Sequence, residues 1–400
     1  MGEIQNQENI LLIFQKIIEQ ESKTSTYKFA LLRAVIDLIT AQSPHIEDRA
    51  THVAIPVQLV SDKWLFYYWD LIAENYSQIH SGRNLAFEEQ LRELQKNHSI
   101  QNYWDFKQEF QKPNYSEELK ERFVSLAKGL NETILKNPVK YIGTSMGKGY
   151  NSLFQVEAGK AIRGNRITGY FDLLLNSPKI LLEKSYFEGL KVYGGLLSGS
   201  NSIIMNWVDF MQNKSLKGPL KSKKEETIAN EDLAVYARRS PLDLLLQSAL
   251  VERQTASIRN FWSQKMKNGH SVFCTWSGEP IKKVDDLAID HAIPFSVLFN
   301  NDYWNLVPAK NSVNSKKSDK ILSKQQLSNS KSRLLSIWKE YQSTTELAPI
   351  FLSQCQISLT KDTEISLEKL FDKFLKINEG FVDLRGMESW NFSKEAENIN

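Results

Sequence analysis

Apolar residues recur with a helical period along the first third of the chain. The first such stretch places on one helix face the side chains of Ile10, Phe14, Ile17 and Ile18. Similar patterns predict helices over 9–21, 27–38, 56–68, 85–98 and 116–136. Residues 1–136 are therefore expected to form a mostly α-helical region.

The pattern changes after residue 137, where glycines become dense. The runs 152–157 and 167–173 are β-prone, and they predict a small β-rich insert. Helical periodicity resumes from about 181 to 212. We expect 137–212 to be this insert with its helices, as part of the same N-terminal domain.

The second half of the chain divides into four predicted segments. Residues 213–232 are lysine-rich and polar, which is typical of an exposed linker or loop. A connecting helix is predicted within 233–269, a new unit over 270–320, and C-terminal helices over 321–400. The fold class expected for the whole chain is α+β.

Composition restricts the class of protein and of site. The chain has 400 residues, 41% of them hydrophobic, and a formal net charge of +3, which fits a globular protein and permits a nucleic-acid partner. Its two cysteines exclude a four-cysteine zinc site and indicate a reducing compartment, so a cytoplasmic location is expected. We find no secretory signal and no apolar run long enough for a membrane.

The candidate chemistry starts at Asp290 and His291, which follow a β-prone run. A carboxylate is a hard oxygen ligand suited to Mg²⁺, and a neutral imidazole accepts a proton from water at neutral pH. A loop, a short β-prone run from Asn305 and a polar helix containing Asn314 come next. This order could bring Asp290 and Asn314 to one ion. The alternative is an ordinary polar loop with turn and cap residues.

The spacing of these residues resembles that of the HNH nuclease family. His291 precedes Asn305 by 14 positions, and Asn305 precedes Asn314 by 9. The preceding segment FCTWSGEPI, 273–281, is similar to the strand and turn of that family, and NSVNSKKSD, 311–319, is similar to its helix. The variant it resembles is that of the type II CRISPR effectors, over about 270–320. The resemblance implies a ββα-metal core.

The resemblance also implies a role for each matching residue. His291 would be the general base, and Asp290 and Asn314 would hold one Mg²⁺, with Mn²⁺ able to substitute. Asn305 would fix the loop through a backbone contact and orient the His291 ring as part of the catalytic set with Asn314. The expected nucleic-acid contacts are Lys310, Lys316, Lys317 and Lys320. No structural zinc is expected.

The function expected from this resemblance is endonucleolytic hydrolysis of DNA, in a restriction or anti-phage defence effector. Two alternatives stay open: a nucleic-acid-binding or scaffold protein with an inactive HNH fold, and a nuclease directed at RNA. The helical N-terminal region resembles, more loosely, the region before the HNH core in a group of bacterial HNH endonuclease-domain proteins. That resemblance implies an ATPase or another defence-system protein as a partner. The sequence leaves the oligomeric state open.

Overall fold

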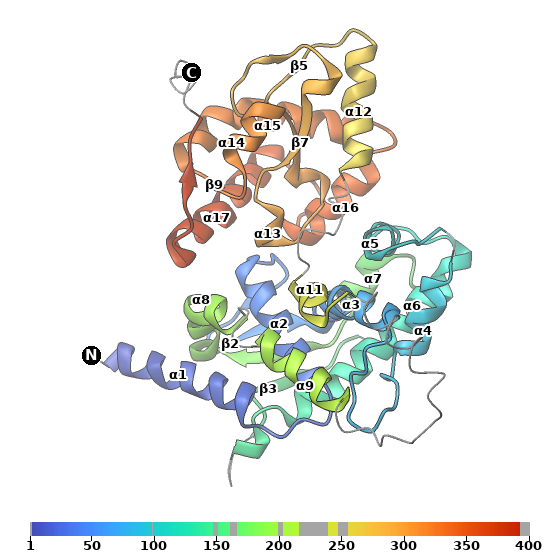
Figure 1. The fold of residues 1–400 in the computed structure, drawn as a ribbon, viewed down its shortest axis with the longest axis vertical. Helices are drawn as coiled ribbons and strands as arrows, with labels where there is room; N and C mark the ends of the chain where they lie inside the picture. The colour runs from blue at the N-terminus through green and yellow to red at the C-terminus, as the bar shows by residue number, and fades with distance from the viewer. Residues whose placement is uncertain are drawn as a thin grey trace, which may run out of the picture. The chain divides into compact units, whose positions relative to one another are not determined.

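The computed structural model describes residues 2–97, 99–146, 151–160, 166–198, 203–215, 239–246 and 255–392. The chain divides into two compact units (Figure 1). The first comprises 1–40, 46–110 and 114–251, and the second comprises 252–400 with the short segments 41–45 and 111–113. Helices predominate and the sheets are small and mostly antiparallel, which confirms the α+β class.

The first unit is built from helices around one small sheet. Its helices are α1 (Gly2–Glu19), α2 (Tyr27–Thr40), α3 (Val57–Ala73), α4 (Glu88–Gln95), α5 (Tyr103–Phe110), α6 (Glu117–Ile134), α7 (Tyr170–Leu175), α8 (Lys184–Ser198), α9 (Met205–Ser215) and α11 (Pro241–Leu246). Its strands are β1 (Glu47–Asp48), β2 (His52–Pro56), β3 (Phe154–Glu157) and β4 (Lys179–Glu183).

Helix α3 forms the centre of this unit. It is apolar on almost every side, and a helix of that kind must be covered by neighbours all round. Trp64, Tyr67 and Tyr68 on α3 are buried, and Tyr27 of α2 stacks on Trp64 with ring centroids 5.3 Å apart. The helices predicted from periodicity in this region are present.

The antiparallel sheet runs in the order β1-β2-β4-β3. Two predictions for this part of the chain are wrong. Residues 167–173 were expected to be β-prone, but α7 forms there because the Asp172 carboxylate accepts from the backbone N–H and hydroxyl of Thr168. A helix was expected from about 181, but the first residues of that range belong to β4, which pairs with β2 and β3. Helix α8 begins only at Lys184. Short apolar runs do not separate strand from helix by period alone.

The predicted linker over 213–232 lies outside the described residues, apart from 213–215, which end α9. The predicted connecting helix is described only in part, as α11 and as α12 (Ala256–Lys267). In the part of the chain that the structure describes, no helix is both long and apolar enough to cross a bilayer.

The second unit contains a strand–strand–helix arrangement surrounded by long helices. Its helices are α12, α13 (Phe295–Leu298), α14 (Asn311–Lys317), α15 (Lys324–Ser343), α16 (Ala348–Ser358) and α17 (Leu367–Arg385). Its strands are β5 (Val272–Phe273), β6 (Pro280–Ile281), β7 (Leu287–His291), β8 (Leu306–Lys310), β9 (Ile321–Leu322) and β10 (Ser389–Trp390).

Strands β7 and β8 pair antiparallel, with His291 opposite Leu306, and α14 follows β8 directly. The helices around them hold β8 in place. The Tyr341 hydroxyl of α15 donates to the Leu306 carbonyl at 2.9 Å and accepts from Trp262 of α12 at 2.9 Å. Burial raises the pKa of Tyr341, so this hydroxyl stays a donor. Because Leu306 pairs with His291, these hydrogen bonds also position the end of β7.

Candidate functional site

Asp290 and His291, at the end of β7, are both buried, with 5% and 4% of their surfaces exposed. A buried ionisable group is tolerated only where hydrogen bonds or opposite charges replace the lost water. The partners of these two side chains therefore define the site.

Asp290 has a neutral donor and a cation as partners. The indole Nε1 of Trp276 donates to Oδ2 at 2.6 Å. Lys317, the last residue of α14, places its Nζ 3.2 Å from both carboxylate oxygens. The same Nζ donates to the His291 carbonyl at 2.8 Å, and the Lys317 side chain is fully buried. Carboxylate and ammonium thus enter the interior as a compensated pair.

Trp276 is itself held in place by hydrogen bonds from α15. Gln326 donates to the Trp276 carbonyl at 3.0 Å, and Arg333 donates to the neighbouring Thr275 carbonyl at 2.6 Å. Burial lowers the pKa of Arg333, which turns inward toward these carbonyls. The support for Asp290 therefore extends from the turn after β5 to a long helix outside the matching sequence motif.

His291 is oriented by the loop that follows it. Its Nε2 lies 2.8 Å from Oδ1 of Asn301, and its ring meets the Phe295 ring edge-on, with centroids 5.5 Å apart. Asn301 was not among the predicted site residues. The sequence signal that could have indicated it is the run of three polar residues Asn300–Asn301–Asp302. All three are buried in the structure.

Asn305 closes the same loop. Its Oδ1 accepts from the Ile293 backbone N–H at 2.8 Å, and its Nδ2 donates to the Ile293 carbonyl at 2.9 Å. The backbone contact expected for Asn305 is therefore formed. The imidazole is hydrogen-bonded by the side chain of Asn301. The catalytic assignment of Asn305 stays a prediction.

Asn314 lies on α14, one turn before Lys317, and is half-buried. Residues three apart share one side of a helix, so Asn314 and Lys317 lie on the same side of α14. Lys317 is the residue of that side that pairs with Asp290. Among the described residues, the Asn314 side chain has no hydrogen-bond partner. The structure thus groups Asp290, His291 and Lys317 by direct contact. Asn314 lies one turn before Lys317 on α14, which packs against β7.

The predicted nucleic-acid contacts fall into different environments. Lys317 needs a correction, because a fully buried ammonium paired with Asp290 has no surface for a phosphate in solvent. Lys310 pairs with Glu279 at 2.9 Å, and Lys320 pairs with Glu388 at 2.7 Å, both at partly exposed positions. Lys316 is exposed and forms no ion pair within the described residues.

The donor set fits a hard cation that keeps much of its own water. No cluster of three or more His, Cys, Asp or Glu occurs in the described residues. Mg²⁺ is commonly held by one or two carboxylates, with waters and substrate phosphates as further ligands. One carboxylate, Asp290 on β7, with the amide of Asn314 on the helix α14 that packs against that strand, is a set of that kind.

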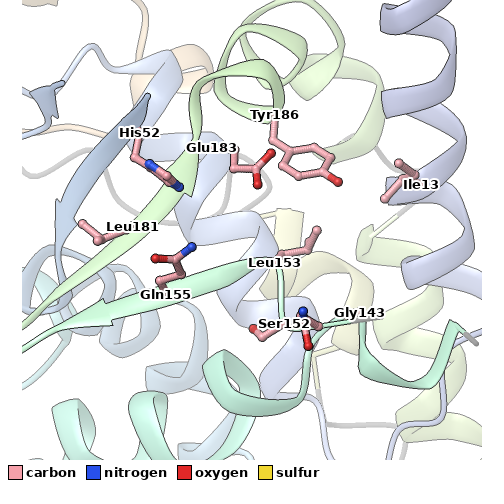
Figure 2. Close-up of a pocket in the computed structure, with 10 residues that line it drawn as sticks. Ile13, His52, Gly143, Ser152, Leu153, Gln155, Leu181, Glu183 and Tyr186 are labelled. Atoms are coloured by element: carbon pink, nitrogen blue, oxygen red, sulfur yellow. The ribbon is translucent and has the colours of Figure 1, made fainter. Parts of the chain in front are cut away.

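A separate pocket of about 200 Å³ lies in the first unit (Figure 2). His52 and Glu183, from paired positions on β2 and β4, lie on its wall together with Tyr186. Nε2 of His52 is buried and has no hydrogen-bond partner. The pocket contains none of the predicted site residues.

The Asp290–Lys317 pair leads to a stability prediction. Lys317→Met should lower the free energy of unfolding by about 3–5 kcal/mol, because it leaves a buried carboxylate without its counter-charge. Adding Asp290→Asn should recover part of that loss. Urea unfolding of both single variants and the double variant measures the coupling. Lys316→Met, at the adjacent exposed position, is the control and should change stability by less than about 0.5 kcal/mol. If the losses of unfolding free energy in the two single variants simply add in the double variant, Asp290 and Lys317 do not stabilise each other.

Two family models match the chain. Residues 274–322 match a family described as HNH endonuclease, which confirms the resemblance predicted over about 270–320. Residues 7–230, more than half of the 400 residues, match a domain of unknown function (DUF8808). No curated protein and no solved structure gives a significant match. The chain therefore belongs to the DUF8808 family and carries an HNH endonuclease domain at residues 274–322.

Proposed function

We propose that this protein is a metal-dependent endonuclease that hydrolyses phosphodiester bonds of DNA. The observation that carries the proposal is the end of β7, where Asp290 and His291 are buried side by side inside the segment that matches the HNH endonuclease family. Both side chains have well-formed partners, Trp276 and Lys317 for one and Asn301 for the other. A site held this rigidly suits chemistry that depends on geometry.

In this proposal His291 is the general base. A neutral imidazole accepts a proton from water near neutral pH, and the water oxygen attacks phosphorus while the bond to the leaving oxygen breaks. Phe295 and Asn301 keep the ring in one orientation. Asn305 prevents the loop after β7 from moving away, because it binds both backbone groups of Ile293.

Asp290 and Asn314 would hold Mg²⁺, or Mn²⁺ in its place. When bound, the ion would neutralise the scissile phosphate and stabilise charge on the leaving oxygen. Trp276 and Lys317 fix the direction in which the Asp290 carboxylate points. These two residues therefore orient a ligand and do not act on the substrate.

DNA is the proposed substrate, with Lys316 and the partly exposed Lys310 and Lys320 near its backbone. Surface ion pairs such as those of Lys310 and Lys320 contribute little to stability, so phosphates can replace their carboxylate partners. RNA stays an alternative substrate, because an attack on the backbone does not depend on the sugar.

One observation favours a second candidate, a binding or scaffold protein with an inactive HNH fold. Lys317 already neutralises Asp290 in the described structure, so the carboxylate has no uncompensated charge that demands a metal. In either case we propose a cytoplasmic protein that acts in restriction or anti-phage defence. A partner protein, such as an ATPase, would bind the first unit.

The first test is cleavage of supercoiled plasmid with Mg²⁺ or Mn²⁺. Wild-type protein should produce nicked or linear DNA, and His291→Ala should lower the rate by at least about 100-fold, because the general base is lost. His270→Ala is the matched control, since His270 is an exposed histidine of the same unit. Equal cleavage by wild type and His291→Ala would refute the assignment of the base. Absence of cleavage by wild type, with DNA bound, would support the inactive fold.

A second test addresses the DNA interface. Lys316→Ala should weaken duplex binding and reduce by about 1 the slope of log binding constant against log salt, because one phosphate contact is lost. Binding is measured without metal in the His291→Ala background, so that no cleavage occurs. Lys369→Ala is the control, because this lysine is highly exposed on α17, outside the matched segment. Equal slopes for both variants would exclude a phosphate contact at Lys316.

A further inference from the structure

The contact between Asn301 and His291 is formed in the interior. Asn301 is 8% exposed and His291 is 4% exposed, and the distance from Oδ1 to Nε2 is 2.8 Å. The other end of the same amide, Nδ2, is buried and has no hydrogen-bond partner. A buried donor without an acceptor is unfavourable, so its presence beside a candidate catalytic group calls for an explanation.

The chemistry of the amide fixes the state of the ring. A neutral imidazole carries one N–H and one lone pair on its two nitrogens, and an amide oxygen can only accept. An Asn301 Oδ1 at hydrogen-bond distance therefore requires the proton on Nε2. The lone pair that can take a proton then belongs to Nδ1.

We propose that Asn301 is a positioning residue for His291: it holds the imidazole in the Nε2–H tautomer and directs Nδ1 toward the attacking water. This inference rests on the proposed function for the role of His291 as a base. The Nδ2 group of Asn301 is then the donor for a non-bridging phosphate oxygen, which only the substrate brings.

The segment that carries Asn301 is built to keep it in place. Asn300 donates to the Asp302 carboxylate at 2.8 Å and accepts from the Asp302 backbone N–H. Ser358 of α16 donates to the same carboxylate at 2.8 Å. Asn300 and Asp302 thus lock the loop on both sides of Asn301. Asn301 is the member of the three whose side chain reaches the histidine.

A buried asparagine outside this loop supplies a matched control. Asn378 of α17 is 1% exposed, and its Nδ2 donates to the Leu322 carbonyl at 2.6 Å. A structural effect of losing a buried asparagine should appear in both Asn378→Ala and Asn301→Ala. An effect on the His291 ring should appear in Asn301→Ala alone.

The direct test is the ring N–H of His291, observed by NMR in full-length protein labelled with ¹⁵N-histidine. The chain has six histidines, and the spectrum of His291→Ala identifies the signal. Wild type should show a slowly exchanging proton on Nε2. Asn301→Ala should lose it to fast exchange, whereas Asn378→Ala and Asn301→Asp, which keeps an acceptor, should retain it. A ring proton on Nδ1 in wild type, or an unchanged Nε2–H in Asn301→Ala, would overturn the proposal.

Plasmid cleavage adds the functional measurement. Asn301→Ala should lower kcat by about 100-fold, as expected when a reacting group is misplaced, while Asn378→Ala lowers the melting temperature and leaves kcat close to wild type. Equal kcat for Asn301→Ala and wild type would overturn the proposal. If wild type itself does not cleave, the proposed nuclease function fails, and the NMR signal still decides whether Asn301 sets the tautomer.

Discussion

The second unit depends on a buried ion pair between Asp290 and Lys317. A carboxylate at the end of a buried strand is unfavourable unless its charge is matched, and here the match comes from the last residue of the helix that follows the next strand. The pair therefore joins β7 to α14 and fixes how the strand–strand–helix arrangement closes. Ser318, directly after Lys317, ends α14 with a φ of 50°, which is strained for a residue with a side chain.

The surrounding helices extend this constraint beyond the segment that matches the HNH family. Helix α15 supports Trp276 through Gln326 and Arg333, and Trp276 in turn donates to Asp290. The same helix holds β8 through Tyr341. The core residues of the unit include side chains of α12, α15, α16 and α17. The segment that matches the HNH family is thus supported by packing and hydrogen bonds from helices outside it.

Much of this site could be predicted from sequence, because the spacing of Asp290, His291, Asn305 and Asn314 is local and ordered. The role of Lys317 could not be predicted in this way. The run KNSVNSKKSD reads as a solvated helix face, and only the fold shows that one of its lysines points inward. Asn301 was missed because polar residues in a loop normally form turns. In the first unit, β4 was missed because its partners β2 and β3 lie far away in the chain, and period alone does not reveal such pairing.

Asp290 and Asn314 are proposed to form a site for a divalent cation beside His291. Anomalous diffraction from crystals of His291→Ala grown with a short DNA duplex and Mn²⁺ would test it most directly. We predict one Mn²⁺ peak at about 2.1 Å from an Asp290 carboxylate oxygen, with the Asn314 amide oxygen and a phosphate oxygen as further ligands. A bound duplex with no peak at Asp290, and Lys317 as the only cation on that carboxylate, would contradict the claim.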